Sequence, residues 1–103
     1  MVFISKQAKI DLDNIIIGLL NWDKVTLTVD EVMQYVDDIV GICYQLDTLT
    51  HHHKATYDDH LKYGQYVFPY KRSKQTTWYI VYAKDFNNKV FVNKIISNYM
   101  TIL

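Results

Sequence analysis

The first half of the chain repeats its apolar side chains every three or four residues, which is the period of an amphipathic helix. One apolar stripe runs along residues 6–20, and Ser5 before it suits an N-cap because its hydroxyl can accept a backbone N–H. A second stripe runs along residues 28–47, where Thr28 and Glu31 have the spacing of a capping box. The pattern predicts two antiparallel helices that form a hairpin.

Short β-favouring runs lie on both sides of this helical part. The first is residues 2–4, and the others follow an aperiodic stretch at 48–64. They are residues 65–71, 76–83 and 89–96. Pro69 cannot donate to a sheet ladder, so we expect its strand at an edge, and we expect 76–83 to be central. The order β-α-α-β-β-β predicts one α+β domain over residues 1–103, with the helical hairpin on one face of a small, mainly antiparallel sheet.

Composition narrows the class of protein. The chain has 103 residues, half of them apolar and 21% charged, which excludes a disordered chain. One cysteine, Cys43, excludes an intramolecular disulfide, and its place on the apolar stripe of 28–47 indicates a buried structural thiol. The N-terminus lacks the features of a signal peptide, and no apolar run has the length of a membrane span. We therefore expect a soluble cytoplasmic protein.

The zero net charge hides an asymmetry between the two halves of the chain. Residues 1–50 carry three lysines against eight acidic residues, a net −5, and residues 51–103 carry eight basic residues against three acidic ones, a net +5. Seven of the nine tyrosines lie in the basic half. Lysines with interleaved aromatic rings suit a nucleic acid, and we expect the basic residues on the sheet face away from the helices. The competing interpretation, which we prefer for Tyr79 and Tyr82, is that tyrosine favours strands and half-buried sites.

Several runs of residues resemble a known family. FISKQAKIDLDNI at the start, and YGQYVFPYKR, TTWYIVYA and NNKVFVNKIIS toward the end, are similar to the RelE/ParE toxin superfamily of bacterial type II toxin–antitoxin modules. The resemblance covers nearly the whole chain and rests on element order and on the hydrophobic cadence of the last two strands. It implies the fold of that family and a cognate antitoxin as partner. It also implies one of two activities, ribosome-dependent cleavage of messenger RNA or inhibition of DNA gyrase without RNA cleavage.

The last strand departs from the family pattern, which commonly has arginine, isoleucine, an apolar residue and then histidine. Lys94 and Ser97 stand here in the places of the arginine and the histidine. Lysine keeps the positive charge but loses the bidentate fork of arginine. The missing histidine favours the gyrase alternative, whereas Tyr99 and the basic strand ends favour the nuclease, which we take as the first interpretation.

Metal-independent RNA cleavage needs a group that takes the proton of the 2′-hydroxyl, a cation near the phosphoryl oxygens and an acid for the leaving oxygen. We predict the catalytic residues from the basic strand ends and the C-terminal tyrosine: Lys71, Arg72, Lys94 and Tyr99. Arg72 is the best phosphate ligand because its guanidinium matches two oxygens. If the strands at 65–71 and 89–96 are neighbours, these cations converge on one phosphate.

Three further residues are predicted to bind the substrate. Lys74 lies in the turn before the central strand, Tyr70 could stack on a base, and His60 could act as a base near neutral pH. The competing interpretation is that Lys71, Arg72 and Lys74 form a solvated basic turn.

No metal and no cofactor are predicted. Neighbouring side chains of an extended chain point to opposite sides, so at most His51 and His53 of the run at 51–53 could share an ion, and a plain polar loop is favoured. The predicted partners are the antitoxin and either the ribosome with its messenger RNA or DNA gyrase. A homodimer stays open, and so does a third function, a non-toxic interaction module that retained the fold.

Overall fold

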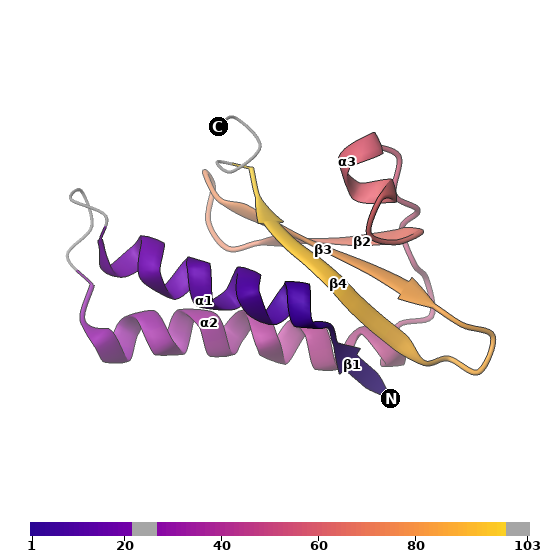
Figure 1. Ribbon diagram of the computed structural model, residues 1–103, viewed down its shortest axis with the longest axis horizontal. Coiled ribbons are helices and arrows are strands. Elements are labelled where there is room, and N and C mark those ends of the chain that lie inside the picture. Colours follow the sequence, from indigo (N-terminus) through magenta and orange to yellow (C-terminus); the bar gives the residue numbers. More distant parts are fainter. Residues whose placement is uncertain (22–26, 99–103) are drawn as a thin grey trace.

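The computed structural model describes residues 1–21 and 27–98, and its elements follow the predicted order with one short helix added (Figure 1). They are β1 (Val2–Ile4), α1 (Lys6–Leu20), α2 (Val29–Tyr44), a 3₁₀ turn η1 (Leu46–Thr48), α3 (Asp58–Leu61), β2 (Tyr66–Lys71), β3 (Thr77–Lys84) and β4 (Val90–Ser97). The β-α-α-β-β-β arrangement is thus confirmed. The second helix ends three residues earlier than predicted, and the 3₁₀ turn fills the difference.

Both long helices begin at the caps that the sequence predicts. Ser5 Oγ accepts from Ala8 N at 3.1 Å. Thr28 Oγ1 accepts from Glu31 N at 3.1 Å, and the Glu31 carboxylate accepts from Thr28 N at 3.3 Å, which completes the capping box. These contacts satisfy backbone donors that a helix start leaves without intrahelical partners.

The sheet has the order β1-β4-β3-β2, with β1 parallel to β4 and the other pairs antiparallel. β2 is an edge strand, as Pro69 predicted, and β3 is an inner strand. Val67 N donates to His53 O at 2.9 Å, on the side of β2 that faces away from β3. The ring nitrogen of Pro69, two residues farther along the strand, faces that same side. A proline there removes no ladder bond and makes the edge a poor template for another strand.

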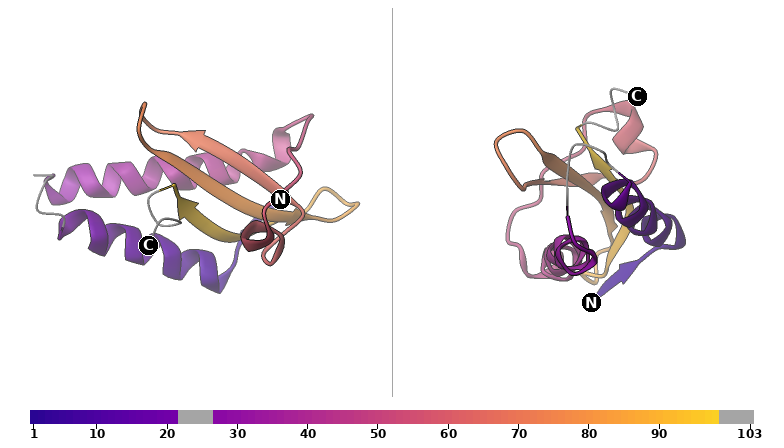
Figure 2. Two further views of the ribbon diagram at one scale, coloured as in Figure 1. Left: turned by 90° about the horizontal axis from the view of Figure 1, so that it is seen from above. Right: turned by 90° about the vertical axis from the view of Figure 1, so that its left-hand side faces the viewer.

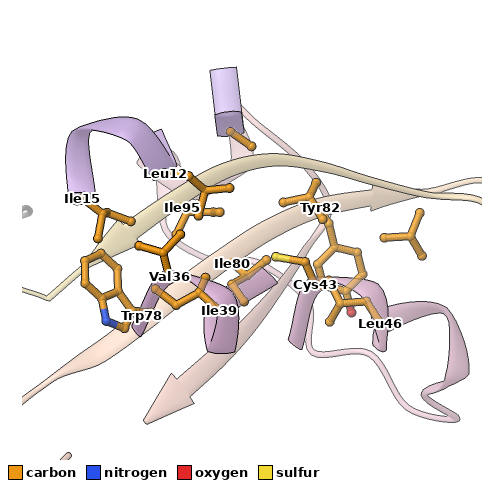
Figure 3. Packing of buried hydrophobic residues seen from close by; sticks show 13 residues of the cluster. Leu12, Ile15, Val36, Ile39, Cys43, Leu46, Trp78, Ile80, Tyr82 and Ile95 are labelled. Carbon is orange, nitrogen blue, oxygen red and sulfur yellow. The ribbon is translucent and has the colours of Figure 1, made fainter. Parts of the chain in front are cut away.

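The helices α1 and α2 cover one face of the sheet, and α3 lies against the other (Figures 1 and 2). The core lies between the helices and the first of these faces, where Ile39 and Cys43 of α2 meet Ile80 and Tyr82 of β3 (Figure 3). All four are fully buried. Cys43 is therefore the buried thiol that its place on the apolar stripe predicts, and burial raises its pKa to about 12. We call the opposite sheet face, which carries α3, the outer face.

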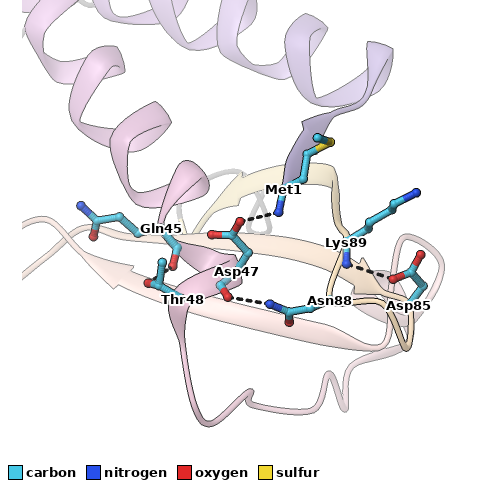
Figure 4. A network of polar contacts seen from close by, with 7 residues as sticks. All are labelled: Met1, Gln45, Asp47, Thr48, Asp85, Asn88 and Lys89. Carbon is cyan, nitrogen blue, oxygen red and sulfur yellow. Dashed lines mark hydrogen bonds and ion pairs between the residues drawn. The ribbon is translucent and has the colours of Figure 1, made fainter.

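A polar network holds the hairpin between β3 and β4 against the end of α2 (Figure 4). The Met1 amino group lies 2.6 Å from Asp47 Oδ2, and Asn88 Nδ2 donates to Asp47 O at 2.8 Å. Asp85 Oδ1 accepts from Lys89 N at 2.9 Å, and Asn88 takes the left-handed φ of 63° that the turn requires. Within the described residues, no helix has the length and apolarity needed to cross a membrane.

Candidate functional site

The predicted cations do not converge on one point, because β3 separates β2 from β4. Lys71 is opposite Thr77 of β3, whereas Lys94 is opposite Val81, four residues farther along the strand. Given a rise of ~3.3 Å per residue and ~4.8 Å between strands, their Cα atoms lie roughly 16 Å apart. The condition set for a shared phosphate site, neighbouring strands, is not met, and the prediction of convergence is wrong.

Arg72 is held by α2 on the helix side of the molecule. Its Nη1 forms an ion pair with Asp38 Oδ2 and donates to the Tyr70 hydroxyl at 3.3 Å. The guanidinium carbon also lies 4.2 Å from the centre of the Tyr35 ring, whose hydroxyl accepts from Trp78 Nε1 at 2.7 Å. The hydrogen bond from Arg72 lowers the pKa of Asp38. Arg72 and Tyr70 therefore join the sheet to α2 instead of facing the outer face.

Lys94 is held in the same way by α1. Its Nζ donates to Asp11 Oδ1 at 2.9 Å and lies 5.4 Å from the centre of the Tyr63 ring. Asp11 is 3% exposed and accepts two more hydrogen bonds, from Ile95 N at 2.9 Å and from Gln7 Nε2 at 3.0 Å. The prediction that basic residues populate the outer face fails for Arg72, which lies on the helix side. Lys94 is opposite Val81 and so lies on the outer face by register, but its charge is neutralised by Asp11 of α1.

The other predicted residues differ in their surroundings. Lys71 and Lys74 are both exposed. Tyr99, the predicted C-terminal catalytic residue, lies outside the described residues. His60, by contrast, is only 4% exposed, although it comes from a stretch of the sequence without periodicity.

His60 lies under α3 between two tyrosine rings. The centre of its imidazole is 5.4 Å from the ring centre of Tyr57 and 5.4 Å from that of Tyr79 on β3. These three residues, with Asp59 and Asn98, line a pocket of about 230 Å³ on the outer face. The pocket therefore combines aromatic walls with three polar side chains of different hydrogen-bonding type.

The imidazole has an unmet hydrogen bond. His60 Nδ1 is buried and has no partner among the described residues. Burial lowers the pKa of His60, and the Asp59 carboxylate opposes this shift without cancelling it. The ring is therefore neutral at pH 7. A buried polar atom without a partner costs free energy, so the position of His60 is one that the fold keeps at some cost in stability.

The segment that carries His60 is fixed to the sheet at two points. Tyr63 N and Gly64 N both donate to His60 O, at 2.9 and 3.2 Å, and Asn93 Nδ2 of β4 donates to Tyr63 O at 2.6 Å. Gly64 packs on the backbone of β3, because a Cβ there would lie 2.3 Å from Tyr82 O. The pocket is therefore a feature of the folded sheet and not of a loose loop.

Strand register brings Lys71 close to this pocket. Pro69 is opposite Tyr79, and Lys71 is opposite Thr77, so Lys71 and Tyr79 are diagonal neighbours on the outer face. Such neighbours have Cα atoms roughly 7–8 Å apart. Of the predicted site residues, the structure therefore brings together His60 and Lys71, with Lys74 in the exposed turn that follows β2.

Four residues that line the pocket were not among the site residues predicted from the sequence: Tyr57, Asp59, Tyr79 and Asn98. Tyr79 was assigned to half-buried packing, which is confirmed, but its ring also forms a wall of the pocket. The available signal was the cluster of aromatic, acidic and imidazole groups at 57–60, which stands out within an otherwise aperiodic stretch.

Nothing in the described part of the chain gathers three or more histidine, cysteine, aspartate or glutamate side chains closely enough to hold a metal ion. In the run at 51–53, the ring of His52 packs on Tyr66 and Tyr82, and its Nδ1 lies 2.6 Å from the Tyr82 hydroxyl. Comparison with protein-family models, with curated proteins and with solved structures found no match.

Proposed function

We propose that this protein is a toxin of the RelE/ParE type that acts on RNA through the outer face of its sheet. Two features support the family: the order of the elements and the resemblance of the strand sequences. The observation that carries the RNA-directed activity is the placement of a buried, neutral His60 and an exposed Lys71 on one end of that face.

These two residues supply complementary parts of a metal-independent cleavage. A neutral imidazole takes the proton of the 2′-hydroxyl, and an ammonium group offsets the charge that develops on the phosphoryl oxygens. The rings of Tyr57 and Tyr79 give a base a surface on which to stack. Lys74, which is exposed in the next turn, adds attraction for the neighbouring phosphate.

This assignment differs from the one based on sequence alone. Arg72 and Lys94 act in the fold, through Asp38 and Asp11, and are not needed near the scissile phosphate. Activity then depends on His60 and Lys71.

The test is inducible expression in bacteria, with growth and messenger-RNA integrity followed together. We expect growth arrest with cleaved RNA for the wild type, and cleavage about a hundredfold slower or more for His60→Gln, which cannot take the proton. Lys71→Ala should weaken activity in the same direction. Lys89→Ala is the matched control, because Lys89 is exposed beside the hairpin that precedes β4, at the other end of that strand from the pocket. Equal activity of His60→Gln and the wild type would contradict the proposed roles.

A second candidate is inhibition of DNA gyrase, and the ion pairs of Arg72 and Lys94 favour it because they remove two cations from any nucleic-acid site. Arrest with intact RNA in the same experiment would move the function to gyrase or another protein target. A folded product that causes no arrest would leave an interaction module.

A cognate antitoxin is the partner that this function requires. We expect the product of a neighbouring small gene to co-purify with the protein and to relieve the arrest. An extended or helical segment laid along the toxin is the expected mode of binding. Absence of co-purification would count against the toxin assignment.

A further inference from the structure

The pocket at His60 has polar groups that distinguish one nucleobase from the others. Its volume of about 230 Å³ is below the roughly 300–1,000 Å³ of pockets for drug-sized ligands, so it suits a single base. The rings of Tyr57 and Tyr79 supply stacking surface. The ring of His60 lines the same pocket, and its Nδ1 is buried without a hydrogen-bond partner among the described residues.

Asp59 sets the polarity of the pocket's edge. Its carboxylate can only accept hydrogen bonds, and its side chain is 75% exposed, so its oxygens are accessible from the pocket. The ion pair with Lys62, at 3.4 Å, is a surface contact of small energy and does not prevent a second partner. The side chain of His60 differs from the Asp59 carboxylate, because a neutral imidazole donates or accepts according to its tautomer.

We propose that this pocket binds one unpaired guanine of single-stranded RNA. Guanine carries two adjacent N–H donors, N1–H and the N2 amino group, which match the two oxygens of the Asp59 carboxylate. Adenine, cytosine and uracil each place an acceptor beside their donor, and this acceptor would face the carboxylate. The inference rests on the proposed function, for which it names the base that the site selects.

The test measures binding without cleavage. The probes are short oligouridylates with a central guanine, adenine or cytosine, or with uracil throughout, all 2′-O-methylated so that no 2′-hydroxyl can react. Fluorescence anisotropy gives the affinity of each. We expect the guanine probe to bind about tenfold more tightly than the others, the effect of one well-placed pair of hydrogen bonds.

Two neighbouring aspartates give a matched pair of variants. Asp59→Asn replaces an acceptor by a mixed group and should reduce the guanine preference to near unity, whereas Asp58→Asn should keep it. Both residues lie in the first turn of α3, but only Asp59 lines the pocket.

The outcomes separate this inference from the proposed function. Equal affinity for the four probes, or equal preference in the Asp58→Asn and Asp59→Asn variants, overturns guanine recognition. Cleavage of RNA in cells without guanine preference would keep the proposed function and overturn this inference. Guanine preference in a protein that neither arrests growth nor cleaves RNA would support the guanine site and contradict the proposed toxin function.

Discussion

Asp11 completes the edge of the sheet where β1 ends. β1 pairs with β4 only from Val90 to Val92, so the outward N–H groups of β4 beyond that point have no strand beside them. Asp11 Oδ2 accepts from Ile95 N at 2.9 Å, and α1 thereby takes the place of a longer β1. The cost of burying this carboxylate is offset by Lys94, whose ammonium group lies 2.9 Å away.

This geometry predicts a structural role for Lys94. Lys94→Met keeps the length of the side chain but leaves Asp11 buried without its cation, so we expect a loss of about 3 kcal/mol in the free energy of unfolding. Urea denaturation measures it. Lys71→Met is the control, and because Lys71 is exposed its stability should change by no more than about 0.5 kcal/mol. Unchanged stability with abolished RNA cleavage in Lys94→Met would instead return Lys94 to the catalytic set.

The sequence identified Lys94, Arg72 and His60 as notable residues, but it could not assign their partners. Asp11 is 83 residues from Lys94, and Asp38 is 34 residues from Arg72. Which carboxylate meets which cation depends on the strand order and on how the helices pack against the sheet. His60 was predicted on its titration range alone, and its burial follows from the packing of Tyr57 and Tyr79 around it.

Among the elements, α3 and the turn after it determine the shape of the outer face. α3 has only four residues, too few for a helical period to appear in the sequence, so the aperiodic stretch at 48–64 predicts a long loop with at most a helical turn. The long helices and the strands were predictable because each has a cap or a sustained period. The position of α3 depends instead on the close approach of Gly64 to the backbone of β3.

Two glycines allow this dependence to be tested. In Gly64→Ala the new Cβ would lie 2.3 Å from Tyr82 O, a backbone atom, so we expect a loss of about 1–3 kcal/mol and a displaced α3. Hydrogen exchange of the amides at 60–64 should quicken, and binding of the guanine probe should weaken. Gly41→Ala, in the middle of α2 and with nothing within 4 Å of its new Cβ, should stabilise the protein by about 0.5–1 kcal/mol. Equal behaviour of the two variants would show that Gly64 does not position the pocket.

Across the whole molecule, the charge asymmetry of the chain acts between its two layers. The acidic half forms the helical hairpin, and the basic half forms most of the sheet. Among the described residues, ion pairs of Arg72 with Asp38 and of Lys94 with Asp11 join these layers. The charge asymmetry that suggested a surface for a polyanion thus partly serves to hold helices and sheet together. Lys71 remains exposed near the pocket, and Lys74 remains exposed in the turn after β2.

As the pH is lowered, the free energy of unfolding should therefore decrease in two steps. Burial lowers the pKa values of His52 and His60, so the unfolded chain takes up protons near pH 6.5 before the folded protein does. Their contribution is complete above pH 6.5 and is lost as the pH falls below it. The hydrogen bond from Arg72 lowers the pKa of Asp38, so this second contribution is complete above about pH 4 and is lost at lower pH.

Urea denaturation at intervals from pH 8 to pH 3 measures both steps, and one variant addresses each. His60→Phe should make the slope between pH 7 and 5 smaller, leaving the part that His52 contributes, and should leave the acid step unchanged. Asp38→Asn should flatten the step below pH 4 and leave the upper one. A profile that is level from pH 8 to pH 5 in the wild type would mean that His60 is not held neutral by burial. The imidazole would then be protonated as readily as in the unfolded chain, and its role as a base would rest on the RNA-cleavage assay of His60→Gln alone.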